Sequence, residues 1–200
     1  MDFKTFRQNF KALPEHEQSF LKIMSMAYVP LTQTELYKLL NLCQVRTAKD
    51  TQFNGPNVKG YWVKLSDEWL HEPIYNRHAV KEHLNEWVMR MAVIDSNFND
   101  WTRTIQNKLP YKEWYRPSSY EGAIRELRFA LYQGRSQAIF EILRDIQMYF
   151  PYKFAEDDFF KKFFHPFSPK WLATFPIAIQ NIAMQQLVGE GISMLEPVED

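Results

Sequence analysis

The sequence predicts a mainly α-helical protein. Only 6 of its 200 residues are glycine, whereas sheet-rich folds place glycine in many tight turns. Apolar residues recur at intervals of three and four, which is the period of an amphipathic helix. Hydrophobic residues make up 46% of the chain and aromatic residues 16%, which is enough to form a core. A chain of this length can hold one large domain or two small ones.

Charge and cysteine content narrow the classes of function. Lys plus Arg and Asp plus Glu both number 24, so the chain as a whole is not an electrostatic binder of nucleic acid or of membrane surfaces. Any basic site must be local. The single cysteine, Cys43, forms no disulfide within the chain and favours a reducing compartment. With no signal-like start and no apolar run of about 20 residues, we expect a soluble cytoplasmic protein without membrane contact.

The first 42 residues predict three helices. A first amphipathic helix is expected over residues 3–13. A second begins at Pro14, where a first-turn proline is tolerated, and runs to about Tyr28. Thr32 and Glu35 have the spacing of a capping box, so a third short helix should begin there.

The next segment predicts a loop and two further helices. Residues 44–57 are polar and contain an Asn-Gly-Pro turn signal, which indicates a loop. Apolar residues then mark a helix over residues 57–70, followed by a break at 71–76. A longer helix is expected from about Arg77 to Ile94.

The second half of the chain predicts a helical hairpin and then shorter helices. The stretch 95–118 is rich in Trp and Tyr, and we expect it to be packed. Ser118 and Glu121 suggest a capping box, and Gly134 is a natural helix stop. A partner helix should end at Pro151, and a last helix should run from Pro176 to about Leu195. We predict one unit over residues 1–95 and a second, a helical bundle or repeat-like unit, over 96–200.

Residues 14–70 resemble a winged-helix DNA-binding domain. The resemblance rests on the segments LTQTELYKLLN (31–41) and NVKGYWVKLSDEWL (57–70), which match its short second helix and its recognition helix. In that family the third helix enters the major groove of duplex DNA. The chain departs from the pattern in its long loop before the third helix and at Pro73, which would reduce any wing.

The resemblance implies a set of nucleic-acid-binding residues on the third helix and the loop before it. These residues are Arg46, Lys49, Asn57, Lys59 and Lys64. Four basic groups predict only weak, salt-sensitive binding to duplex DNA. The alternative is a winged-helix scaffold that makes protein contacts or packs internally.

Two further resemblances concern the rest of the chain. Residues 118–150 resemble a tetratricopeptide-type hairpin, although a generic helix pair is the alternative. Residues 165–191, taken with the winged-helix-like start, resemble the N-terminal region of large bacterial Swi/Snf-type helicase-like ATPases. This resemblance implies an ATPase motor downstream of the chain.

No catalytic apparatus is visible in the sequence. His78 and His83 are five residues apart, not the four that place two ligands on one helix face, and no Cys-x-x-Cys pair occurs. The acidic run 156–158 is better suited to capping a helix than to binding a cation. Neither a phosphate-binding loop nor a nucleophile elbow is present. We therefore expect no enzyme activity, no metal and no cofactor.

The leading hypothesis is a non-catalytic accessory module of a larger nucleic-acid-acting protein or complex. Its rival is a helical protein-interaction scaffold that binds no nucleic acid. The folded surface distinguishes them. A basic strip along residues 46–64 would favour nucleic acid, and a neutral face exposing Trp or Tyr would favour a protein partner or a downstream domain.

Overall fold

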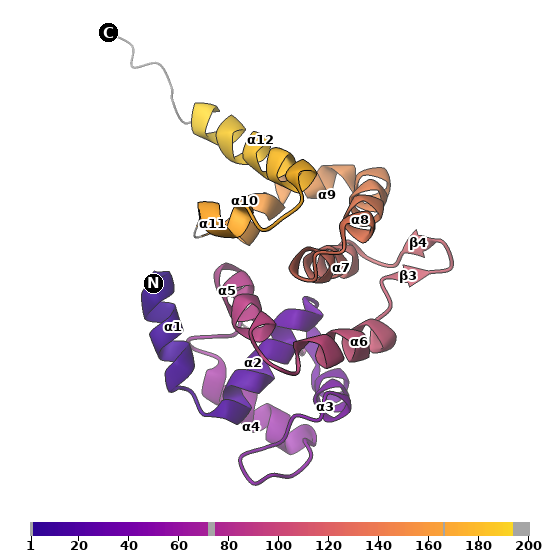
Figure 1. Ribbon diagram of the computed structural model, residues 1–200. Helices are drawn as coiled ribbons and strands as arrows, with labels where there is room; N and C mark the ends of the chain where they lie inside the picture. The colour runs from indigo at the N-terminus through magenta and orange to yellow at the C-terminus, as the bar shows by residue number, and fades with distance from the viewer. Residues whose placement is uncertain (1, 72–74, 166, 194–200) are drawn as a thin grey trace. The chain divides into compact units, whose positions relative to one another are not determined.

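The computed structural model describes residues 2–71, 75–165 and 167–193 (Figure 1). Within this part the fold is mainly α, as the sequence predicts, with only short two-stranded sheets. The chain forms two compact units, which divide between Phe129 and Ala130. The sequence predicts a boundary at residue 95. The observed division lies later because the helix that follows residue 95 packs on earlier helices of the first unit.

In the residues that the structure describes, the first unit contains six complete helices and most of a seventh. They are α1 (Phe3–Ala12), α2 (Glu15–Ala27), α3 (Gln33–Leu42), α4 (Gly55–Leu65), α5 (Glu82–Val93), α6 (Phe98–Lys108) and α7 (Tyr120–Tyr132). Its strands are β1 (Leu31–Thr32), β2 (Arg77–His78), β3 (Lys112–Glu113) and β4 (Arg116–Pro117). The last turn of α7 belongs to the second unit.

Side-chain caps define the ends of α3 and α4. The capping box predicted at Thr32 and Glu35 is present, since each residue bonds the backbone N–H of the other. At α4 the prediction needs correction. The Asn54 side chain accepts from the N–H of Asn57, so the helix begins at Gly55 inside the expected loop. It ends at Leu65, five residues earlier than predicted.

A small sheet occupies the place where the sequence predicts the start of a helix at Arg77. β1 pairs antiparallel with β2, Leu31 lies opposite His78, and Leu70 forms a further bridge to Val80. Arg77 bonds the Pro30 carbonyl and Glu35, and these contacts hold this segment extended. The following helix therefore starts only at Glu82. Pro73, expected to reduce the wing, lies outside the described residues.

The core of the first unit is built around α2. Its residues from Phe20 to Ala27 are all buried except Lys22, and α2 packs mainly against α5. The rings of Phe6, Phe10 and Trp69 contact one another, and Phe6 also contacts Trp87. The ring centroids in these pairs are 5.3–5.8 Å apart. This aromatic cluster joins α1 to the turn after α4 and to α5.

A fully buried arginine attaches α7 to α2 and α5. Arg128 Nη1 donates to the Ser25 carbonyl at 2.8 Å, and Nη2 donates to Asn85 Oδ1 at 3.1 Å. Its Nε lies 2.5 Å from Glu86 Oε1, an ion pair rather than an aligned hydrogen bond. The guanidinium also covers the ring of Tyr28 at 4.5 Å. A buried charge is tolerated only with such compensation.

The start of α7 differs by one residue from the prediction. Ser119, not Ser118, supplies the cap, since its hydroxyl accepts from the Gly122 N–H at 2.9 Å. Ser118 instead donates its N–H to the Tyr111 carbonyl, which closes the base of the β3–β4 hairpin. The stretch 95–118 is thus a helix followed by a hairpin.

The second unit continues with helices α8 (Ser136–Tyr149), α9 (Pro151–Glu156), α10 (Phe159–Phe164), α11 (Pro169–Leu172) and α12 (Ile177–Ser193). Gly134 stops α7 as predicted, at a φ of +64°. Phe163, Phe164, Trp171 and Phe175 pack as one aromatic cluster. The predicted end of the last helix at Leu195 lies outside the described residues.

Candidate interaction surfaces

The basic residues of α4 point in different directions. Lys59 and Lys64 are five residues apart, which separates them by about 140° around a helix. Lys59 lines a groove that also contains Val63 on the same side of α4. Lys64 lines a second hollow together with Asn57. The structure therefore does not place the two lysines on one shared face.

Lys64 is already paired with a buried carboxylate. Its Nζ forms an ion pair with Oε1 of Glu17 on α2, and the Glu17 side chain is only 2% exposed. His16 Nε2 lies 3.5 Å from the same oxygen. Because a buried carboxylate needs a partner, the charge of Lys64 serves the fold and contributes little to an outer basic surface.

The first of these hollows, which we call the α4 groove, has a volume of about 610 Å³. It is lined by Thr32, Gln33, Thr34, Lys59, Trp62, Val63, Ser66, Asn76 and His78. Among these described lining residues, Lys59 is the one permanently charged side chain. Val63 is 71% exposed. The exposed surface of the groove is mainly apolar, and Lys59 is the single cation among these residues.

An aromatic stack forms the floor of the α4 groove. The rings of Trp62 and His78 are parallel within 21°, with centroids 3.6 Å apart. Trp62 is 7% exposed, so the tryptophan that could have been on the surface is buried. Burial lowers the pKa of His78 below its ordinary value of 6.5, which favours the neutral imidazole. Within the described residues, Trp62 Nε1 and His78 Nδ1 have no hydrogen-bond partner.

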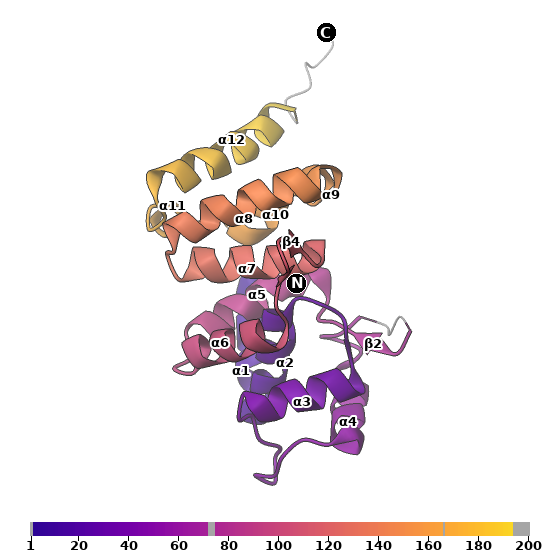
Figure 2. The same cartoon turned by 90° about the vertical axis from the view of Figure 1, so that its right-hand side faces the viewer.

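Arg46 and Lys49 lie on the loop between α3 and α4, away from the α4 groove. The loop leaves the C-terminal end of α3, whereas β2 lies beside its N-terminal end (Figure 2). Thr32, Gln33 and Thr34 at that N-terminal end line the α4 groove. A helix of ten residues separates these ends by about 15 Å. Arg46 lines a different hollow of about 590 Å³, which Glu15 and Asp100 also line.

Neighbouring basic residues are also committed to the fold. Arg77 bonds Glu35 at 3.1 Å, and Lys81 Nζ donates to the Asp67 carbonyl at 2.6 Å. Burial raises the pKa of Glu35, but hydrogen bonds from Thr32 and the positive charge of Arg77 lower it by more. The net result is a Glu35 pKa below its ordinary value. Of the predicted residues, Lys59 lines the α4 groove, whereas Asn57 and Lys64 line the second hollow, which Ala48 of the loop also lines.

The most exposed aromatic side chains of the 95–118 stretch lie at the tip of the β3–β4 hairpin. The sequence predicts packing for this stretch, and Trp101 is indeed 5% exposed. Trp114 and Tyr115 contradict it, at 94% and 87% exposed. The signal that could have located them is the short run YKEWYR, which has no helical period and is bounded by Pro110 and Pro117.

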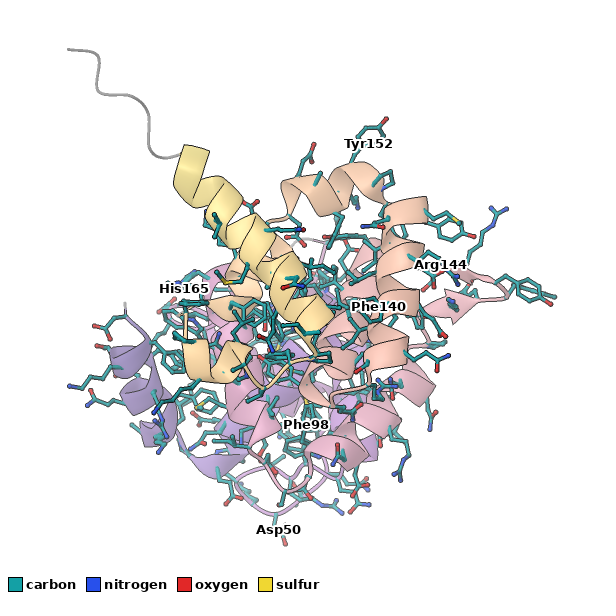
Figure 3. All side chains as sticks on the ribbon, turned by 45° about the horizontal axis from the view of Figure 1, so that its top comes forward. Asp50, Phe98, Phe140, Arg144, Tyr152 and His165 are labelled. Atoms are coloured by element: carbon teal, nitrogen blue, oxygen red, sulfur yellow. The ribbon has the colours of Figure 1, made fainter. Side chains whose placement is uncertain are left out.

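A second exposed row lies on α8 and α9 of the second unit. Phe140 and Met148 on α8 and Tyr152 on α9 are 43%, 64% and 83% exposed. Arg144 is exposed in the same row, at intervals of four residues (Figure 3). This row is apolar with one cation.

Cys43 and the acidic run 156–158 are further groups that the sequence singles out. Burial raises the pKa of the Cys43 thiol to about 12, so the thiolate needed for nucleophilic chemistry is scarce at neutral pH. In the described ranges no three metal-ligating side chains gather. Asp157 of the acidic run pairs with Lys162 at 2.6 Å. None of the helices in these ranges has the length and apolar character to cross a membrane.

Comparisons of the chain with protein-family models, with curated proteins and with solved structures found no match. Its surfaces must therefore be interpreted from their own geometry.

Proposed function

We propose that this chain is a non-catalytic adaptor module that holds a protein segment in the α4 groove. The observation that supports the proposal is the character of this groove. Val63 is 71% exposed above a buried Trp62–His78 stack, and Lys59 is the only permanent charge among the described lining residues. Exposed apolar surface with few charges favours a protein partner over a phosphate backbone.

The chemistry of the groove defines the segment that it would accept. Apolar side chains would cover Val63 and the edge of Trp62, and a carboxylate would pair with Lys59. The hydroxyl and amide groups of Thr32, Gln33 and Asn76 would bond the backbone of the segment. Such a segment is short, extended and mildly acidic.

Weak contact with duplex DNA is the second candidate. It is favoured by the order of elements, because α2, β1, α3 and α4 are followed by the pairing of β2 with β1 and of Leu70 with Val80. This order resembles that of a winged-helix domain, in which α4 would be the recognition helix. The pairing of Lys64 with Glu17 weakens this candidate.

Site-specific photo-crosslinking tests the two candidates in cells that express the protein. A photoreactive phenylalanine analogue replaces Val63 in one variant and Ile94 in a control. Ile94 is a matched control because it is also apolar, 71% exposed and in the same unit, but outside the α4 groove. We expect a discrete protein adduct from position 63 and none from position 94.

Two results would overturn the proposal. A nuclease-sensitive adduct at position 63 would show that α4 faces nucleic acid. Equal adducts at both positions would show that the groove has no special affinity. If the adduct is nuclease-sensitive, the affinity for duplex DNA, measured by fluorescence anisotropy, should fall as salt is raised. The Lys59→Ala variant should also bind the duplex more weakly.

The proposal also includes the compartment in which the protein works and the assembly that it serves. An unreactive buried Cys43 and the lack of disulfides fit a reducing cytoplasmic environment. We further propose that the module serves a larger nucleic-acid-acting assembly, as its resemblance to helicase-associated regions implies. Hydrolysis of a nucleotide by the purified chain, lost on substitution of one of its residues, would contradict the non-catalytic assignment.

A further inference from the structure

The β3–β4 hairpin displays two aromatic rings on a rigid base. Ser118 closes this base, since its N–H donates to the Tyr111 carbonyl at 2.6 Å and its hydroxyl bonds the same oxygen at 3.2 Å. Buried Arg125 of α7 donates to the Leu109 carbonyl just before the hairpin. The tip residues Trp114 and Tyr115 therefore project from a fixed support.

The tip is built against the usual preferences of a turn. Glu113 pairs with Arg116, so Trp114 and Tyr115 form a two-residue loop. Trp114 has a φ of +62° and Tyr115 is not among the positive-φ residues, which is the pattern of a type II′ turn. Glycine is the preferred residue at that first position. A tryptophan there is strained and leaves a large apolar ring in water, and such outliers concentrate at functional sites.

The charges around the tip indicate an anionic partner. The hairpin and its flanks, residues 108–116, contain three basic side chains and one acidic one, in a chain whose net charge is zero. Arg116 and Lys108 are exposed, and Lys112 lies 5.3 Å over the ring of Tyr111. Exposed aromatic rings interleaved with cations are the recurring composition of single-strand nucleic-acid platforms.

Other partners fit these residues less well. Trp, Tyr and Arg are enriched at protein interfaces, but lysine and glutamate are depleted at their centre, and Lys112 and Glu113 directly precede the rings. Insertion into a bilayer interface would bring the Glu113 carboxylate toward an anionic surface.

We propose that the β3–β4 hairpin binds single-stranded nucleic acid, with Trp114 and Tyr115 stacking on bases and Arg116 and Lys108 contacting phosphates. DNA and RNA offer the same stacking faces and phosphates, so either could be the source. The proposal is independent of the α4 groove, because different residues carry it. Binding should be weak, on the order of micromolar at low salt, since few phosphates are contacted.

The tryptophans provide an internal probe. Of the six, Trp62, Trp69, Trp87 and Trp101 are buried and Trp171 is partly buried, whereas Trp114 is 94% exposed. Iodide therefore quenches mainly the emission of Trp114. A 15-residue oligothymidylate or oligouridylate that stacks on this ring should protect it from iodide, and comparison of the two separates DNA from RNA.

Variants Trp114→Gly and Tyr75→Gly make the test specific. Tyr75 is a matched control, since it is 92% exposed, has a φ of +50° and lies on another turn of the same unit. By anisotropy with labelled oligonucleotides, Trp114→Gly should lower the affinity about ten-fold, as expected for the loss of one stacked base. Tyr75→Gly should leave the affinity unchanged. Arg116→Ala should flatten the salt dependence by about 0.7 in the logarithmic slope.

Three results would overturn the proposal. The first is no binding of either oligonucleotide at low salt by the folded wild-type chain. The second is an equal loss of affinity in the Trp114→Gly and Tyr75→Gly variants. The third is hairpin-dependent binding to vesicles of 30% phosphatidylserine without binding to oligonucleotides, which would assign the tip to a membrane. Thermal unfolding of each variant confirms that it is folded.

Discussion

The outer face of α4 and the β3–β4 hairpin differ from their sequence-based expectations in opposite directions. The α4 segment has basic residues that suggest a binding surface, but Lys64 forms an ion pair with buried Glu17, and Trp62 is buried against His78. The hairpin looks like packed aromatic sequence, yet Trp114 and Tyr115 are almost fully exposed beside Arg116. A residue type therefore indicates a surface function only when its partners and its burial are known.

The largest difference in the effect of a substitution on stability should appear between Trp62 and Trp114. Trp62→Ala removes a buried ring and its stack with His78, so we expect a loss of about 3 kcal/mol in the free energy of unfolding. Trp114→Gly removes a ring that contacts mainly water and relieves a positive φ, so the stability should be unchanged or higher. Urea unfolding of both variants measures the difference. A large loss for Trp114→Gly would mean that the hairpin tip is structural.

Substitutions of the two lysines of α4 should also differ in their effect on the free energy of unfolding. Lys64→Ala leaves Glu17 buried without its cation, which should cost about 1–3 kcal/mol of stability. Lys59→Ala changes an exposed helix position and should stay within about 0.5 kcal/mol. Urea unfolding provides both values. A double-mutant cycle with Glu17→Gln isolates the pair, and additive effects would show that the two side chains do not interact.

A smaller, pH-dependent effect should come from His78. Its pKa is lowered by burial in the folded state, so the unfolded chain binds a proton more readily. Stability should therefore be complete above the unfolded value of about 6.5 and decline as the pH falls through the lower folded pKa. Unfolding curves between pH 7.5 and 5 would show this decline. His78→Gln should remove this part of it, and an identical pH dependence in that variant would exclude His78 as the source.

Local sequence rules predicted much of the helical framework. The Thr32–Glu35 capping box and the stop at Gly134 were read correctly because both depend on residues a few positions apart. The pairing of β2 with β1 was missed, since it joins residues more than 40 positions apart. The same limit applies to the surfaces, because neither the Glu17 partner of Lys64 nor the exposure of Trp114 leaves a local pattern.

The most direct test compares both regions in one experiment. A single-stranded oligonucleotide containing 5-bromodeoxyuridine is bound to the wild-type chain, crosslinked with ultraviolet light, and the attached peptides are identified by mass spectrometry. Our account predicts adducts at Trp114 or Tyr115 and none within residues 55–65. Adducts on α4 with none on the hairpin would contradict it and would return nucleic-acid binding to the surface that the sequence first indicates.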